Sequence, residues 1–384
     1  MQTRRKFLNQ SLALGCAAAA SPLITPVSFA AARGDNRLVV IVLRGAMDGL
    51  DVVRPLGDPH LKSYRSGLDA EDSLVLDDFF GLHPALEPLL PLWRSGELSF
   101  AHAVSTPYRD KRSHFDGQNI LEAGVSSEDI GTDGWLNRMV SLMPDAHAET
   151  AFAIGRENMR LLMGPAPNAT WAPDSDLNLS PQAQLLLKKV YAGDALFEQA
   201  ASKAMELAKL TNDPMSPRRA TRADALARFA AGRLREDTRI AAFSINGWDT
   251  HANQHRTLPN ALGELATAIT TLKADLGPVW STTCVLCVTE FGRTVRENGS
   301  RGTDHGTGGA AIFAGGALKG RQVLGDWPGL ATADLYRDRD LMPTSDVRTY
   351  AAWAMMGLFG IGATQATQTV FPGLELIENP GLLS

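Results

Sequence analysis

The sequence predicts an α/β fold, a doubly wound and mostly parallel β-sheet with helices on both faces. Residues 38–43 form an unbroken apolar run, which is typical of a strand that a parallel sheet buries on both faces. Two further runs of this kind, 240–245 and 283–289, are separated by an amphipathic stretch over 258–276. Strand, helix and strand at this spacing predict a parallel βαβ unit. The 384 residues, 44% of them hydrophobic, suffice for one large domain over 35–384.

The first 30 residues differ from the rest and predict a twin-arginine export signal. Residues 4–8 read R-R-K-F-L, and a charge-free, Ala-rich stretch follows from 11 to 32. Pro22 and Pro26 interrupt the apolar helix of roughly 20 residues that a membrane span needs, so we expect cleavage of 1–30 rather than a retained anchor. The expected partner during export is the twin-arginine translocase, and the expected location is the periplasm or another exported compartment.

Charge and cysteine content narrow the expected partners and bonds. Cleavage removes three positive charges and shifts the formal net charge from −5 to −8, so nucleic acid is not an expected partner. Cys16 leaves a lipoprotein-type signal as an alternative.

Cys284 and Cys287 lie three residues apart in a predicted strand and point to opposite faces, so we expect two buried core residues without a mutual disulfide.

Helices are expected around this sheet at several places. A stretch over 83–95 has helical spacing that prolines interrupt, and a last helix is expected from 345 to about 358. Residues 182–236 are rich in Ala, Arg and Glu and predict a helical hairpin insertion. No chemistry is expected from this insertion.

A further strand over 98–104 leads to a helix whose first residues could carry chemistry. Ser113 starts this helix and Gly124 ends it. Arg109 and Arg112 precede Ser113, and a hydroxyl at a helix N-terminus beside arginines suits a nucleophile next to an anion-binding site. The alternative is a plain N-cap.

Carboxylates and histidines follow the other three strands just past their carboxyl ends, where open α/β sheets bind ligands. His251 and His255 share a face if their segment is helical. The alternatives are a turn-forming Asp48 before glycine and a surface loop with incidental histidines. Carboxylates with imidazoles suit zinc, manganese or calcium, so the sequence predicts a divalent metal site. The candidate ligands are Asp48, Asp249, His251, His255, Glu290, Asp304 and His305.

Arginines in the same loops indicate an anionic ester such as a phosphate or sulfate. They are Arg44, Arg109, Arg112, Arg293 and Arg301.

Five motifs, together with the export signal, resemble one family over nearly the whole mature chain. They are L-R-G-A-M-D-G-L at 43–50, R-S-H-F-D-G-Q at 112–118, G-W-D-T-H-A-N-Q at 247–254, T-E-F-G-R-T at 289–294 and D-H-G at 304–306. The sequence is similar to the family with the domain of unknown function 1501, which is placed in the alkaline phosphatase and sulfatase superfamily. The resemblance implies an alkaline phosphatase-like sheet and a metal site for cleaving phosphate or sulfate esters.

The resemblance also implies roles for single residues. Asp48 matches the metal ligand after the first strand, and Ser113 matches the nucleophile. Asp249 and His251 match ligands of a second metal, with His255 as a substitute.

The departure from the superfamily pattern lies after the strand at 283–289. Glu290 takes the place of an aspartate, Phe291 takes that of a histidine, and His305 matches a more distant histidine. One metal position is therefore expected to lack a ligand. Residues 105–109 also fit the S-x-P-x-R pattern of serine-type sulfatases, which makes Ser105 the alternative nucleophile.

Two functions are therefore expected. The first is an exported metal-dependent hydrolase whose substrate is a small anionic ester or a sulfated or phosphorylated glycan. The alternative, which Phe291 motivates, is a non-catalytic member of the superfamily that binds an anionic glycan or a cell-envelope partner.

Overall fold

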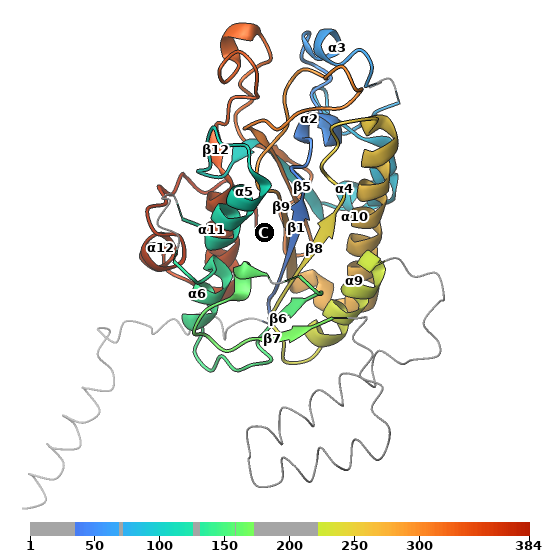
Figure 1. Cartoon of the computed structure of the whole chain (residues 1–384). Coiled ribbons are helices and arrows are strands. Elements are labelled where there is room, and N and C mark those ends of the chain that lie inside the picture. The colour runs from blue at the N-terminus through green and yellow to red at the C-terminus, as the bar shows by residue number, and fades with distance from the viewer. Residues whose placement is uncertain (1–34, 69–71, 126–130, 158, 173–221) are drawn as a thin grey trace, which may run out of the picture. The chain divides into compact units, whose positions relative to one another are not determined.

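A nine-stranded sheet lies at the centre of the described part of the protein (Figure 1). The structure is a computed structural model and describes residues 35–68, 72–125, 131–157, 159–172 and 222–384. The predicted export signal and the first part of the predicted helical hairpin, 182–221, lie outside these ranges.

Four strands match the predicted runs to within two residues at each end. They are β1 (Arg37–Arg44), β5 (Leu98–Ser105), β8 (Ile240–Asn246) and β9 (Thr283–Val288). β1 pairs in parallel with β8 on one side and β9 on the other, so the prediction of a parallel centre is confirmed.

One central strand, β10 (Gly309–Ala314), was not predicted, and it runs antiparallel between β9 and β5. Because β10 is antiparallel to both of its neighbours, β5 points the same way as β9. The carboxyl ends of β1, β5, β8 and β9 therefore meet at one edge of the sheet, as predicted.

The remaining strands lie toward the sides or in a separate small sheet. β6 (Ala151–Ile154) and β7 (Ala169–Trp171) extend the sheet in parallel beyond β8. β11 (Val323–Leu324) and β12 (Ser345–Asp346) pair with β5. A small antiparallel sheet holds β2 (Val53–Arg54), β3 (Leu74–Val75) and β4 (Gly81–Leu82).

Helices cover both faces of the main sheet, which confirms the predicted doubly wound α/β class (Figure 1). One face carries α4 (Leu90–Arg94), α9 (Arg222–Leu234) and α10 (Gln254–Leu276), and the other carries α5 (His114–Ala123), α6 (Trp135–Ser141) and α11 (Val347–Phe359). The shorter helical elements are α2 (Gly49–Val52), α3 (Leu61–Tyr64), α12 (Ala363–Gln365), the 3₁₀ turns at Pro84–Leu89, Arg160–Leu162, Gly277–Thr282 and Thr332–Asp334, and a π-turn at Ala366–Val370. Across the described ranges, no helix is both long and apolar enough to cross a membrane.

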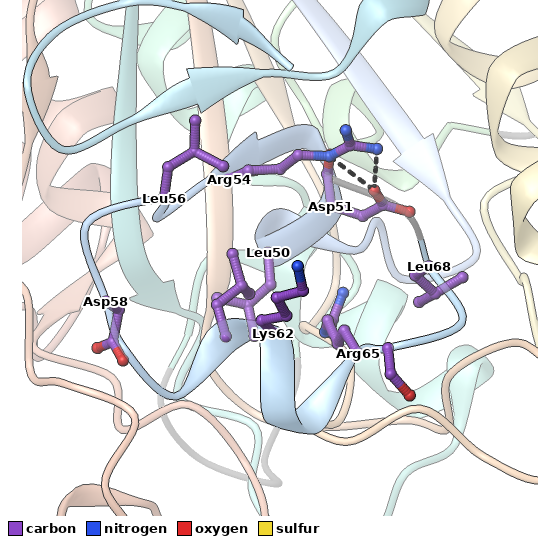
Figure 2. Close-up of a pocket in the computed structure, with 10 residues that line it drawn as sticks. Leu50, Asp51, Arg54, Leu56, Asp58, Lys62, Arg65 and Leu68 are labelled. Carbon is purple, nitrogen blue, oxygen red and sulfur yellow. Dashed lines mark hydrogen bonds and ion pairs between the residues drawn. The ribbon is translucent and has the colours of Figure 1, made fainter. Parts of the chain in front are cut away.

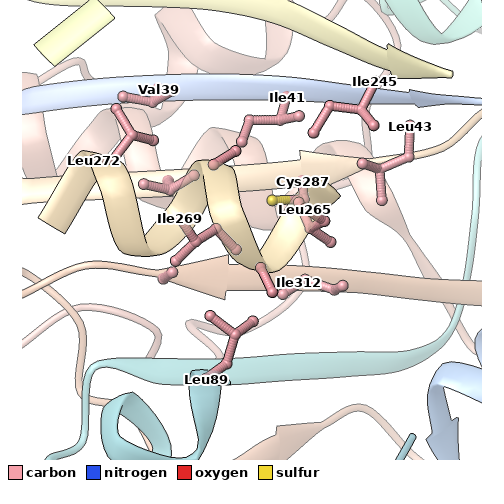
Figure 3. Close-up of a cluster of buried hydrophobic side chains, with 14 of the residues drawn as sticks. Val39, Ile41, Leu43, Leu89, Ile245, Leu265, Ile269, Leu272, Cys287 and Ile312 are labelled. Atoms are coloured by element: carbon pink, nitrogen blue, oxygen red, sulfur yellow. The ribbon is translucent and has the colours of Figure 1, made fainter. Parts of the chain in front are cut away.

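Two cores form because neighbouring residues of a strand point to opposite faces of the sheet. Figure 3 shows one of them, in which side chains of β1 such as Ile41 meet Leu265 and Ile269 of α10. Cys287 belongs to this core and Cys284 to the core on the opposite face. Both cysteines are free and buried, as predicted, and burial raises the pKa of each thiol.

The predicted start and end of α5 are confirmed. The Ser113 hydroxyl accepts a hydrogen bond from the Asp116 amide at 3.3 Å, and Gly124 ends the helix with a φ of 67°. α10 starts four residues before the predicted 258, because Asn253, with a φ of 50°, turns the chain directly into the helix.

Candidate metal centre

Three side chains from different loops meet at the carboxyl edge of the sheet. His114 is the first residue of α5, Asp249 follows β8, and His305 lies in the loop between β9 and β10. One ligand-type atom from each lies within 4.8 Å of the corresponding atom of the other two. The sequence predicted Asp249 and His305 as ligands, and the structure adds His114.

His114 is oriented by Glu290. Its Nδ1 lies 2.8 Å from Glu290 Oε1, and its Nε2 lies 3.4 Å from Asp249 Oδ2. This hydrogen bond to Glu290 raises the pKa of His114 above its ordinary value. Nε2 is buried, and none of the described residues provides a hydrogen-bond partner for it. A buried polar nitrogen without a partner requires an explanation.

His305 and His251 are held in the same way as His114. His305 Nδ1 lies 2.9 Å from the Arg112 carbonyl oxygen, and His251 Nδ1 lies 3.1 Å from Asp304 Oδ1. On the opposite side of the rings, the two Nε2 atoms lie 3.0 Å apart. Both are also close to Asp249 Oδ1, at 3.2 Å for His305 and 3.1 Å for His251.

The partners of the three Nδ1 atoms are a carbonyl and two carboxylates, which can only accept hydrogen bonds, so each Nδ1 is placed to donate. The Nε2 atoms also face carboxylate oxygens of Asp249, and with a cation bound there each neutral ring would carry its proton on Nδ1. Burial alone would raise the pKa of Asp249, but the Arg293 guanidinium outweighs it and the net pKa is lowered. Three Nε2 atoms thus surround an ionised carboxylate. Histidines that donate Nδ1–H to a carboxylate or carbonyl and turn Nε2 inward are typical of metal sites.

The donor set fits a divalent metal ion. His114, Asp249 and His305 would hold it, and His251 lies close enough to join them. Two or three imidazole nitrogens with one carboxylate suit zinc, and three protein ligands leave a position open for water or substrate. Calcium is less suited, because it prefers oxygen ligands.

Glu290 lies behind His114 instead of in the cluster. Its carboxylate is completely buried, and Oε1 accepts hydrogen bonds from the Gly45 amide at 2.9 Å, His114 at 2.8 Å and Gln118 at 3.1 Å. Oε2 accepts one from the Thr289 hydroxyl at 3.0 Å. Burial raises the pKa of Glu290, but these donors outweigh it and the net pKa is lowered. The structure therefore places Glu290 against Nδ1 of His114 and outside the group of His114, Asp249 and His305, where the sequence suggested a ligand.

Asp48 is also kept from the cluster by other partners. Arg65 donates to both of its oxygens, at 2.7 and 3.0 Å, and Gln254 donates at 2.7 Å. The carboxylate is buried, so the Arg65 guanidinium supplies the cation that Asp48 needs. The sequence could not show this, because Arg65 and Gln254 come from distant parts of the chain.

Asp304 and His255 lie outside the cluster as well. Asp304 accepts from Asn298 at 3.0 Å and from His251, so it orients an imidazole as Glu290 does. His255 is exposed in the first turn of α10, and the cluster does not include it.

Two of the arginines expected to bind an anion are turned toward the backbone. Arg293 is buried and makes five hydrogen bonds, four to carbonyl oxygens and one of 2.6 Å to Asp249 Oδ1. Arg109 donates to the carbonyl oxygens of Thr106 and Tyr108. Arg112 is exposed, and its carbonyl oxygen contacts His305.

The two candidate nucleophiles differ in position. Ser113 precedes His114, caps α5 with its hydroxyl, and donates its amide to the Tyr108 hydroxyl at 2.6 Å. Ser105 is buried at the end of β5, paired with Asp346 of β12. Of the two, Ser113 directly adjoins a residue of the cluster.

Phe291 forms an aromatic wall beside the cluster. Its ring stacks on His114 with 5.3 Å between centroids and lies 5.1 Å from the ring of His305. Gly117 allows this packing, because a Cβ there would lie 2.9 Å from Phe291 Cδ1. Phe291 therefore fills space next to the histidines, at the position where the resemblance implies a ligand.

The sequence did not single out His114, although its motif was noted. The available signal was its position as a histidine directly after the cap of a helix that starts at the carboxyl edge of the sheet.

A separate cavity of about 400 Å³ lies among residues 50–68 (Figure 2). Leu50, Leu56 and Lys62 line it, and the ion pair between Arg54 and Asp51, 2.7 Å long, forms part of its wall. None of the residues that Figure 2 draws belongs to the histidine cluster, so the cavity is not part of the candidate metal centre.

Several solved structures are similar to this one at low sequence identity. A protein in the alkaline phosphatase superfamily from Vibrio parahaemolyticus is 12% identical, with 89% of this chain and 71% of that chain covered and a TM-score of 0.37. The TAB5 alkaline phosphatase with Mg bound in its M3 site is 12% identical, with 73% and 90% covered and a TM-score of 0.35. The C-terminal periplasmic domain of EcEptC from Escherichia coli, in complex with Zn, is 11% identical, with 91% and 92% covered and a TM-score of 0.37.

No curated protein matches the sequence. The family described as "Protein of unknown function (DUF1501)" matches residues 131–362, more than half of the chain. This range includes Asp249 and His305 and ends within the segment after α11. The chain therefore belongs to the DUF1501 family, as the motifs indicated.

Proposed function

We propose that the protein is an exported, metal-dependent hydrolase of phosphate or sulfate esters with one metal ion, held by His114, Asp249 and His305. The observation that carries this proposal is the buried Nε2 of His114, which makes no hydrogen bond to the described residues and lies 3.4 Å from a carboxylate oxygen of Asp249. Zinc is the expected ion, with manganese as the alternative. A bound ion would act as a Lewis acid and lower the pKa of a water or hydroxyl group.

The chain's own residues have distinct parts in this proposal. Glu290 keeps the proton of His114 on Nδ1, and Asp304 does the same for His251. Ser113 is the proposed nucleophile, because it directly precedes His114 in the chain. Its hydroxyl oxygen accepts a hydrogen bond from the Asp116 amide, so the hydroxyl proton is available for transfer. Arg112, exposed and next to Ser113, is the proposed contact for the anionic group of the ester.

A single metal ion is proposed, although the superfamily resemblance suggested two. Asp48 is engaged by Arg65 and Gln254, and Phe291 fills the space beside the histidines. Both observations favour a mononuclear centre.

The test combines metal analysis with an ester screen. We expect the purified protein to bind about one equivalent of Zn²⁺ or Mn²⁺ and to hydrolyse at least one aryl phosphate, phosphodiester or sulfate. His114→Ala should abolish metal binding, and Ser113→Ala should abolish turnover while the metal stays bound. His60→Ala, which changes an exposed histidine outside the cluster, is the matched control. Absence of stoichiometric metal in the native protein would refute the proposal.

A second candidate function is non-catalytic binding of an anionic glycan or a cell-envelope partner. The observation that favours it is the use of Arg109 and Arg293 for backbone carbonyls, which leaves the centre with fewer cations than an ester hydrolase commonly presents. Metal binding without turnover, together with binding of a sulfated oligosaccharide, would support this function. Turnover that Ser113→Ala abolishes would exclude it.

Export by the twin-arginine route is also proposed, on the R-R-K-F-L motif at 4–8. Replacing both Arg4 and Arg5 by Lys should keep the protein in the cytoplasm with its first 30 residues attached. Export of that variant at the native level would refute the proposal.

A further inference from the structure

Gln118 of α5 joins Glu290 to an arginine at the end of β1. Its Nε2 donates to Glu290 Oε1 at 3.1 Å, and its Oε1 accepts from Arg44 Nη1 at 2.9 Å. The same Glu290 oxygen accepts from His114 Nδ1 at 2.8 Å. A continuous chain of hydrogen bonds therefore runs from Arg44 to the imidazole.

The chemistry of the two outer partners fixes the amide of Gln118 in one orientation. A guanidinium can only donate hydrogen bonds, and an ionised carboxylate can only accept them. The amide oxygen must therefore face Arg44, and the amide nitrogen must face Glu290. A flipped amide would place two acceptors together at Glu290 and two donors together at Arg44.

Arg44 is itself held by two carboxylates. Its Nε lies 2.8 Å from Glu157 Oε2, and its Nη2 lies 2.8 Å from Oε1 of the buried Glu122. Asn246 of β8 donates to Glu157 at 2.7 Å, and Ser244 donates to it as well. The sequence placed Arg44 among arginines that could bind an anionic ester. Its donors instead serve Gln118 and the two glutamates.

We propose that Gln118 is a positioning residue of the metal centre and that Arg44 sets the direction of its amide. Gln118 holds the Glu290 carboxylate where it accepts the Nδ1 proton of His114, so that the Nε2 lone pair faces Asp249. The proposal rests on the proposed metal centre, and it assigns to Gln118 an effect on ring orientation. Glu290 Oε1 also accepts from the Gly45 amide at 2.9 Å, so loss of Gln118 loosens the carboxylate without releasing it.

Two substitutions separate orientation from packing. Gln118→Met removes the donor at similar volume, and Gln118→Glu keeps the shape and the acceptor for Arg44 but places a second carboxylate against Glu290. Loss of a residue that directly orients a metal ligand typically weakens binding about 10–100-fold, and Gln118 is one contact further out, so we expect Gln118→Met to raise the Kd for Co²⁺ at the lower end of this range, by about tenfold. Gln118→Glu should raise it further. If Gln118 acted through packing alone, the isosteric Glu would be the milder change.

The measurements are the Kd for Co²⁺ by chelator competition, the visible spectrum of the Co²⁺ protein, and the thermal midpoint of the metal-free protein. Gln322→Met is the matched control, because the Gln322 side chain donates to the Lys319 carbonyl near β11. We expect a changed spectrum and a higher Kd in the Gln118 variants and neither in the control. A lower thermal midpoint with unchanged Kd and spectrum would overturn the proposal, and so would no change at all.

A metal-free measurement separates this proposal from the proposed function. ¹⁵N NMR of the histidine rings, recorded at a pH where the His114 ring is neutral, reports which nitrogen of His114 carries the proton. We expect Nδ1–H in the native protein and a mixture of tautomers in Gln118→Met. If the native protein binds no metal, the proposed function fails while the NMR result still decides the role of Gln118. An unchanged tautomer in Gln118→Met would overturn that role.

Discussion

Replacing Glu290 by glutamine tests the arrangement of the candidate metal centre without disturbing the fold. The amide oxygen of the substituted side chain can take the position of Oε1, where three donors converge. The amide nitrogen then faces the Thr289 hydroxyl. That hydroxyl can direct its single proton to the Leu43 carbonyl at 2.8 Å, and its oxygen can then accept a hydrogen bond from the amide nitrogen. Each polar group keeps a partner, and we expect the free energy of unfolding to change by about 1 kcal/mol or less.

Metal affinity should respond much more strongly to this change. The Nδ1 proton of His114 loses an ionised acceptor and gains a neutral one, which makes Nε2 a weaker ligand. The expected loss is about 10–100-fold in affinity, which corresponds to about 1.4–3 kcal/mol.

The assay is competition between the protein and a chelator for Zn²⁺ or Co²⁺, with urea unfolding of the metal-free protein alongside. Glu87→Gln, which changes an exposed glutamate, is the control. A Glu290→Gln protein that folds normally and binds metal within twofold of the native affinity would refute the orienting role of Glu290.

Three further predictions concern stability. Asp48→Asn leaves the buried Arg65 without its carboxylate, so urea unfolding should show a loss of about 3–5 kcal/mol, and a loss below 1 kcal/mol would contradict the ion-pair assignment. Gly117→Ala should lower both the thermal midpoint and the metal affinity, because the new Cβ would lie 2.9 Å from the Phe291 ring. Gly263→Ala is the control: the space around this position in α10 is open, so the folded protein should become more stable by about 0.5–1 kcal/mol. Equal effects of the two substitutions would contradict the packing argument. Burial lowers the pKa of His102 to about 4, so the unfolded protein binds a proton at this residue more readily than the folded protein. The free energy of unfolding should therefore be highest above about pH 6.5 and fall by up to about 3 kcal/mol toward pH 4. Urea unfolding at pH 7 and pH 5 should show a smaller dependence on pH in His102→Gln.

The sequence was sufficient for four of the nine strands of the main sheet, including the parallel centre. The runs at 38–43, 98–104, 240–245 and 283–289 are mostly apolar because both faces of these strands are covered, and such runs can be recognised without contacts. β10 was missed because its short run of alanines, one isoleucine and one phenylalanine lies between glycines and resembles a loop.

The site was predictable by position and less so by role. Asp249, His251, Asp304 and His305 do gather at the carboxyl edge of the sheet, where the strand ends placed them. Whether a carboxylate binds a metal or a neighbouring side chain depends on the donors that surround it. Glu290 is surrounded by donors from two other segments, the loop after β1 and α5, and no spacing within the sequence shows that.

Arg293 has a consequence for how the protein would acquire its metal. Its guanidinium joins Ala46 after β1, Trp248 after β8 and Thr303 in the loop before β10, and it does so with backbone oxygens. These loops are thereby held together without a metal ion. The conformational entropy of the side chains that would bind the ion is therefore lost when the protein folds and not when the ion binds. If the proposed centre binds a metal ion, the protein would fold first and bind the ion afterwards. Its thermal midpoint should rise with metal concentration only by mass action, unlike that of a small zinc domain that unfolds when metal is removed.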